Sequence, residues 1–153
     1  MGTRHLQSVI TKEGKKVISQ YGQWDGYPAG QGIEILEYLR KGNLDKYQEN
    51  ASKMPILTQK QCDKVNKDPN WDKNYPYLSR DCGSKIHQMI EDGTVKFITL
   101  MNGFEAEKWC EGFYTIDFNK NTFTSDYHGR VHSFSLDKLP TNKRYLKLMV
   151  EGS

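Results

Sequence analysis

Long apolar runs are missing from this sequence of 153 residues, although apolar residues make up 36% of it. A membrane-spanning helix needs about 20 consecutive apolar residues, and no stretch approaches that length. The chain shows no signal-peptide pattern, and Leu6 stands where a myristoylation motif requires Ser or Thr. We therefore expect a cytoplasmic protein that does not bind membranes.

A strong charge of one sign is missing as well. The 22 basic and 19 acidic residues give a net charge of +3. Proteins that bind DNA usually carry a basic face or stripe, so this near balance predicts no DNA binding. The three cysteines, Cys62, Cys82 and Cys110, have neither the even number of a disulfide framework nor the close spacing of a zinc site. We expect reduced thiols.

Recognisable catalytic and cofactor motifs are also lacking. The sequence has no P-loop, no nucleophile-elbow G-x-S-x-G and no dinucleotide-binding glycine pattern between a strand and a helix. His128 and His132 lie four residues apart, but Gly129 and the β-rich surroundings argue against a helical pair of metal ligands. The sequence therefore predicts no metal and no cofactor.

The most unusual stretch is residues 21–32, YGQWDGYPAGQG, which we call the aromatic loop. It contains four glycines, three aromatic residues, one proline and one carboxylate. Glycine permits turns and close approach, proline fixes a torsion, and Trp and Tyr offer flat faces with a polar tip. This mixture is typical of a rigid loop that presents side chains to a partner.

The hydrophobic pattern predicts strands at both ends of the chain and helices between them. A hairpin is expected over residues 3–11 and 16–20, and further strands over 94–101, 112–118, 122–127 and 131–136. Helices are expected over 30–41, 43–53 and 58–67, and one opened by residues 79–83 and ended by Gly93. Residues 68–76 are expected to form a surface loop, and residues 139–150 either a strand or a short helix.

This order of elements predicts an α+β fold in a single domain, residues 1–153. We expect one antiparallel sheet, built from the N-terminal hairpin and the C-terminal meander, with the helices packed on one face. The aromatic loop then joins the hairpin to the start of a helix, where free N–H groups can receive an anion near Gln31 and Gly32. Alternatively, the glycines only permit close packing of strand and helix.

The side chains of the aromatic loop suit a flat, polar ligand such as a nucleotide. Its three aromatic rings can stack on a base, and its amides and carboxylate can pair with base edges or ribose hydroxyls. Basic side chains near residues 4–5 and 80 can meet phosphate. The predicted ligand-binding residues are Arg4, His5, Tyr21, Gln23, Trp24, Asp25, Tyr27, Gln31, Arg80 and Asp81. Alternatively, the rings close a corner of the core, with Asp25 capping a turn.

Three segments resemble the signature of a widespread, largely uncharacterised family of small proteins from phages, bacteria and fungi. The family pattern reads approximately TRxL, then YGQWDGYPxGQG, then LSRDxG, and residues 3–6, 21–32 and 78–83 match it. The resemblance extends to the tyrosine-rich C-terminal hairpin. It implies, by association with phages, a protein that sequesters a nucleotide immune signal in the host cytoplasm.

We therefore expect a binding protein for a small nucleotide-like ligand, in the form of a phage anti-defence protein that sequesters a cyclic nucleotide or a cyclic ADP-ribose-type signal. One alternative is a small hydrolase or nucleotide-processing enzyme that uses Asp25, His5, Arg80 or Asp81. Another is an inhibitor that contacts a host protein through the aromatic loop, since Trp, Tyr and Arg dominate interface hot spots. Self-association also stays open.

Overall fold

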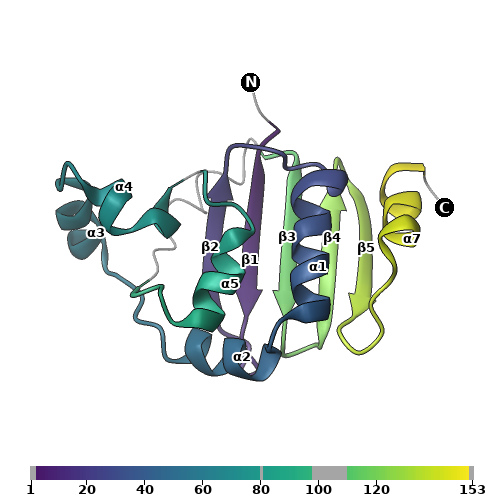
Figure 1. The fold of residues 1–153 in the computed structure, drawn as a ribbon, viewed down its shortest axis with the longest axis horizontal. Helices are drawn as coiled ribbons and strands as arrows, with labels where there is room; N and C mark the ends of the chain where they lie inside the picture. The colour runs from purple at the N-terminus through teal and green to yellow at the C-terminus, as the bar shows by residue number, and fades with distance from the viewer. Residues whose placement is uncertain (1–2, 80, 98–109, 152–153) are drawn as a thin grey trace.

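A five-stranded sheet forms one layer of the protein. The computed structural model describes residues 3–79, 81–97 and 110–151 (Figure 1). The strands, in the order β2-β1-β3-β4-β5, are β2 (Lys16–Gly22), β1 (His5–Ile10), β3 (Gly112–Asp117), β4 (Thr122–Tyr127) and β5 (Arg130–Ser135). The predicted hairpin and meander are confirmed and lie side by side.

The pairing between the hairpin and the meander differs from our expectation. β1 and β3 run parallel, whereas the other neighbours are antiparallel, so the sheet is mixed rather than antiparallel throughout. β2 and the helices after it bring the chain back to the end where β1 begins. There the backbone N–H of Glu111 donates to Arg4 O at 3.0 Å, which aligns the starts of β1 and β3.

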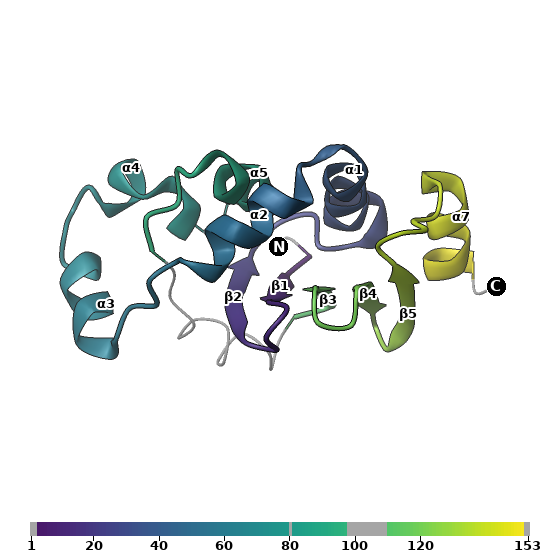
Figure 2. The ribbon, with the colours of Figure 1, turned by 90° about the horizontal axis from the view of Figure 1, so that it is seen from below.

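Helices make up the second layer, and α1, α2 and α5 cover one face of the sheet (Figure 2). In Figure 1, α3 and α4 lie beyond the β2 edge, and α7 lies at the β5 edge. This confirms the α+β class. The helical segments are η1 (Pro28–Gly32), α1 (Ile33–Lys41), α2 (Leu44–Ser52), α3 (Gln59–Asn66), α4 (Trp71–Asn74), η2 (Pro76–Leu78), α5 (Lys85–Asp92), α7 (Asn142–Leu146) and η3 (Lys147–Glu151).

Local sequence signals explain several of these boundaries. Thr58 and Gln61 form a reciprocal capping box at the start of α3, and Asn43 accepts a hydrogen bond from the Lys46 N–H at the start of α2. Gly93 ends α5 in the left-handed conformation. Residues 139–150, for which a strand or a short helix was expected, hold the helical segment α7 and all but the last residue of η3.

The predicted strand over residues 94–101 is wrong for the part that the structure describes. Residues 94–97 lie in no strand, and residues 98–101 lie outside the described residues. Val95 is buried, and the ring of Phe97 packs edge-on against Tyr75 and Tyr77. The Lys96 N–H donates to Tyr77 Oη at 3.2 Å, so a side chain takes the place of a neighbouring strand.

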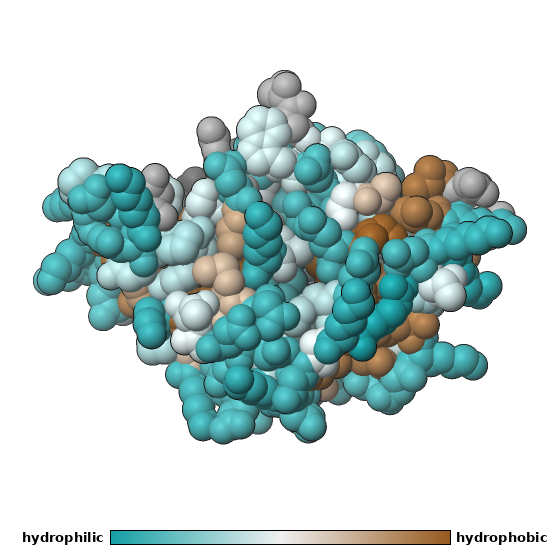
Figure 3. All heavy atoms as spheres, viewed as in Figure 1, coloured by the Kyte–Doolittle hydropathy of each residue, from teal (hydrophilic) through white to brown (hydrophobic). Residues whose placement is uncertain are grey.

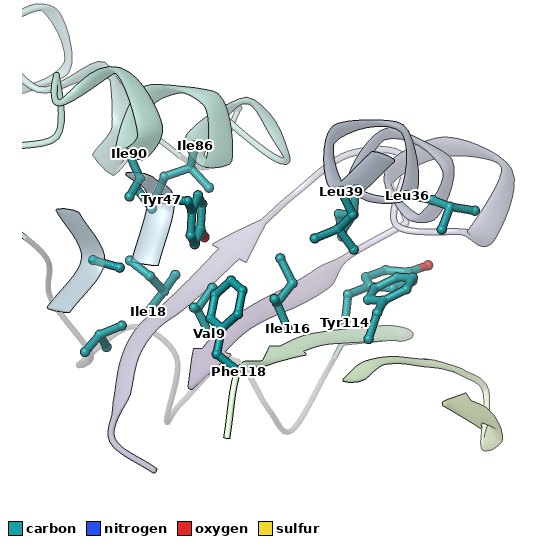
Figure 4. Packing of buried hydrophobic residues seen from close by; sticks show 14 of the residues in the cluster. Val9, Ile18, Leu36, Leu39, Tyr47, Ile86, Ile90, Tyr114, Ile116 and Phe118 are labelled. Carbon is teal, nitrogen blue, oxygen red and sulfur yellow. The ribbon is translucent and has the colours of Figure 1, made fainter. Parts of the chain in front are cut away.

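The core lies between the sheet and the helices (Figure 4). It consists of apolar and aromatic side chains, whose burial is the main driving force of folding. Its centre is formed by Val9 and Ile18 of the hairpin, Tyr114, Ile116 and Phe118 of the meander, Leu36 and Leu39 of α1, Tyr47 of α2, and Ile86 and Ile90 of α5.

The outer surface of the helical layer is mainly hydrophilic in Figure 3, and apolar side chains gather toward the side where α7 lies. Among the described residues, no helix has the length and apolarity required to cross a bilayer. Predicted loop 68–76 lies at the opposite end and contains the single-turn helix α4.

Candidate functional site

Three segments that lie far apart in the sequence meet at the aromatic loop. The Gly26 N–H donates to Thr3 O at 2.9 Å, just before β1. The indole Nε1–H of Trp24 donates to Asp81 Oδ1 at 2.6 Å. The loop therefore joins both the segment before β1 and the segment before α5.

The backbone of the loop is fixed from inside and from the sheet. The Gln31 N–H donates to Asp25 O at 2.8 Å, and Tyr114 Oη of β3 donates to Gly26 O at 2.6 Å. Asp25 has a φ of +57°, which is uncommon for a residue with a side chain. A Cβ added at Gly30 would lie 2.4 Å from Asp25 O, so only glycine permits this closure.

Two aromatic side chains of the loop face solvent. Trp24 is 47% exposed and Tyr27 is 39% exposed. Each is held at its polar tip by a carboxylate, because Tyr27 Oη donates to Asp25 Oδ1 at 3.2 Å, as Trp24 does to Asp81. The hydrogen bond to Asp25 and its negative charge raise the pKa of Tyr27. Both rings thus present apolar faces in fixed positions.

Gln31 is used inside the protein. Its side chain is buried, and its Oε1 accepts hydrogen bonds from Ser84 N at 2.8 Å and from Ser84 Oγ at 2.6 Å. Its Nε2–H donates to Trp24 O at 3.3 Å. Gln31 therefore ties the backbone at Trp24 to the start of α5. The Gln31 N–H already bonds to Asp25 O, so it is not available for the anion that we expected at this position.

His5 belongs to a buried polar network under α5. Gln7 Nε2 lies 2.8 Å from Ser84 Oγ and 3.4 Å from His5 Nδ1, and Gln7 Oε1 lies 2.6 Å from His87 Nε2. His87 Nδ1 in turn lies 2.8 Å from Tyr47 Oη. The sequence interpretation placed His5 at a ligand, but its side chain is fully buried.

The donors and acceptors of this network fix the direction of its hydrogen bonds, which runs from Tyr47 to Gln31. Tyr47 donates to His87, which donates to Gln7, whose amide donates to Ser84, and Ser84 donates to Gln31. Each histidine is neutral in this scheme. Burial lowers the pKa of His5 to about 4, and burial together with the neighbouring His5 lowers the pKa of His87 to about 3.

Sequence reasoning missed Gln7, Tyr47, Ser84 and His87. A signal was present, because residues 5, 7 and 9 of a strand point to the same face. His5 and Gln7 therefore share the face of the core residue Val9, and buried polar side chains require partners. The partners themselves lie about 40 to 80 residues away along the chain, so spacing could not identify them.

The remaining predicted site residues differ in whether their side chains already have partners inside the protein. Arg4 forms an ion pair with Glu111 at 3.0 Å, and its backbone N–H donates to Glu111 Oε2 at 2.7 Å. Tyr21 Oη donates to Gln23 Oε1 at 2.5 Å. Arg80 lies outside the described residues. Asp81 is exposed and lies beside Trp24, so Trp24 and Asp81 are the best-placed pair for a ligand.

Asp81 also lines a pocket. Its volume is about 340 Å³, and its lining residues are Pro76, Ser79, Asp81, Cys82, Lys85 and Met89. Binding sites for small molecules typically measure 300–1,000 Å³. Burial raises the pKa of the Cys82 thiol to about 11, so this thiol is protonated at neutral pH and is a poor nucleophile.

Metal binding has no support in the part of the chain that the structure describes. There, no group of three or more His, Cys, Asp or Glu side chains is arranged to hold an ion.

In comparisons with known proteins, no family model, no curated protein and no solved structure matches this chain. The site therefore has to be interpreted from its own chemistry.

Proposed function

We propose that the protein binds a small nucleotide-like ligand whose base stacks on Trp24. The observation that carries this proposal is the combination of an exposed indole, a carboxylate at its edge and an adjacent pocket of about 340 Å³. Exposed aromatic faces stack on bases of any kind. The pocket beyond Asp81 is large enough to receive the part of the ligand that extends from the base.

The ring is prepared for binding before the ligand arrives. Its Nε1–H is held by Asp81, and its backbone carbonyl accepts a hydrogen bond from the buried Gln31 side chain. A side chain that is already ordered loses less conformational entropy on binding. We therefore favour a ligand-presenting role for the aromatic loop, although Gln31 and Gly26 also close a corner of the core.

Lys85 is the described cation best placed for a phosphate, because it is exposed and lines the pocket with Ser79 and Asp81. Arg4 had been expected in this role, but its guanidinium is paired with Glu111 at 3.0 Å. In our proposal the base lies on Trp24 and the phosphate lies toward Lys85.

We favour capture of the ligand over hydrolysis. His5 would be the general base of a hydrolase, but its imidazole is fully buried and burial lowers its pKa to about 4. Cys82 is held in the thiol form. Sequestration of a cyclic nucleotide or cyclic ADP-ribose-type immune signal is the biological setting that we propose, and it rests on the resemblance carried by residues 3–6, 21–32 and 78–83.

Capture and catalysis are separated by the fate of the ligand. The protein is incubated with a panel of mononucleotides and cyclic dinucleotides, native mass spectrometry records the complexes, and denaturation releases the bound compound for chromatography. We expect at least one nucleotide to bind and to be recovered intact. Recovery of a cleaved product would favour the hydrolase alternative, and the absence of any complex would refute the proposed function.

A further inference from the structure

We propose that the base bound on Trp24 is guanine, and that Asp81 recognises its two adjacent N–H donors. This inference rests on the proposed function and deepens it, because an aromatic face alone does not distinguish one base from another. Discrimination has to come from polar groups at the edge of the stacking ring, and Asp81 occupies that edge.

The position of Asp81 is fixed on both sides. Its Oδ1 accepts the indole Nε1–H of Trp24 at 2.6 Å, and its backbone N–H donates to Ser79 Oγ at 3.1 Å. Its side chain is exposed, and among the described residues its Oδ2 has no hydrogen-bond donor. A base stacked on the indole therefore meets a carboxylate whose lone pairs are only partly used by the described residues.

An ionised carboxylate can only accept hydrogen bonds. Guanine offers it two neighbouring donors, N1–H and N2–H, in the arrangement that a carboxylate matches. Adenine offers the N6 amino group beside the lone pair of N1, which the negative charge repels. Hypoxanthine keeps N1–H but lacks the amino group, and uracil has its N3–H between two carbonyl oxygens. Charge-assisted pairing therefore favours guanine over the other bases.

The charge around the loop supports this choice. Asp25 is exposed on the same loop as Trp24, and its carboxylate, at the hydroxyl of Tyr27, adds a second negative charge to the loop. Such a field disfavours a phosphate on the indole and favours a base edge that carries donors. The phosphate is then directed toward the pocket, where Lys85 supplies the positive charge.

The test compares GMP, IMP and AMP by isothermal titration calorimetry, since these three differ at the edge that Asp81 would contact. We expect the order GMP, then IMP, then AMP, with GMP about ten-fold tighter than AMP, in the range of discrimination by paired hydrogen bonds. Equal affinities, or a preference for AMP, would overturn the inference and leave the proposed function standing. No binding of the three while a cyclic dinucleotide without guanine binds would overturn the inference alone, and no binding of any nucleotide in the panel would overturn both.

Asp81→Asn provides the matched variant. Its carboxamide oxygen still accepts the Trp24 indole, while an amino group replaces the second acceptor. We expect GMP affinity to fall about ten-fold and the preference over AMP to disappear. Asp45→Asn, on the exposed first turn of α2, is the control and should keep the preference. If Asp81→Asn keeps it too, Asp81 does not read the base. The comparison of GMP, IMP and AMP on the wild type tests the inference even if the variant is unstable.

Discussion

The imidazole of His5 lies directly against the α-carbon of Gly22 on the neighbouring strand. These two residues are cross-strand partners, and a Cβ added at Gly22 would lie 1.9 Å from His5 Nε2. That nitrogen is buried and has no hydrogen-bond partner among the described residues. The first glycine of the aromatic loop is therefore required by the buried network, and not only by the turn that follows it.

Gly22→Ala should destabilise the protein by about 1–3 kcal/mol, the usual cost of overpacking a close-packed site. Urea denaturation of the wild type and the variant measures the change in unfolding free energy. In a His5→Ala background the same substitution should cost clearly less, because the clashing ring is gone. An unchanged cost in that background would contradict the contact as the cause.

Stability should decrease as the pH falls below about 6.5. Burial lowers the pKa of His5 to about 4 and that of His87 to about 3, from an ordinary value of 6.5. The folded state therefore binds fewer protons than the unfolded state between pH 6.5 and 4. The stabilisation is complete above pH 6.5 and is lost at up to roughly 1.4 kcal/mol per pH unit for each histidine.

Urea denaturation at pH 7, 6 and 5 checks this slope. The control is His132→Gln on the edge strand β5, which leaves both buried imidazoles in place and should keep the slope. A free energy of unfolding that stays constant from pH 7 to pH 5 would show that the two histidines are not held neutral.

Ser84→Ala should destabilise the protein by about 1–3 kcal/mol, the cost of leaving buried polar groups without partners. The substitution removes the acceptor of the Gln7 amide and one donor to Gln31. Ser52→Ala is the control, because this hydroxyl bonds to Gln48 O on the exposed side of α2. Denaturation curves should separate the two variants, and equal losses would argue against the buried network.

Cys82 should react slowly with iodoacetamide at pH 8. Burial raises its pKa to about 11, so only a small fraction is present as the reactive thiolate. Peptide-resolved mass spectrometry follows the alkylation of this cysteine alone. Labelling should accelerate as the pH rises toward 11 and should slow when GMP fills the pocket. Labelling at pH 8 as fast as that of an unfolded control would contradict this environment.

Short sequence patterns predicted the hairpins and the helix boundaries, because neighbouring residues determine these features. Apolar and β-branched residues bounded by turns predicted β1 and β2 as a hairpin, and β3 to β5 as a meander. The aromatic loop was expected between a strand and a helix, and it runs from the last two residues of β2 to the start of α1, but its residues Pro28–Gly32 form the helical segment η1 instead of an irregular loop. Thr58 marks the start of α3 because its hydroxyl caps the helix, and Gly93 ends α5 because glycine adopts the left-handed conformation readily.

Long-range partners could not be predicted from spacing. The parallel pairing of β1 and β3 depends on where the helical layer returns the chain. Arg4 was expected at a phosphate, but Glu111, 107 residues away, occupies its guanidinium. Gln31 was expected at a ligand or an anion, but its backbone N–H and its side chain form hydrogen bonds inside the protein. The sequence shows no clear pattern for η1, so these partners could not be predicted.

The central claim is that Trp24 forms the stacking face of a nucleotide site. Calorimetric titration of GMP into wild-type protein, Trp24→Ala and Trp71→Ala tests it most directly; Trp71 lies on α4, outside the loop. Loss of a base stack costs about 1–3 kcal/mol, so Trp24→Ala should weaken binding about ten-fold or more, with an unchanged circular dichroism spectrum and with Trp71→Ala binding like the wild type. Equal GMP affinity of Trp24→Ala and the wild type would contradict the claim.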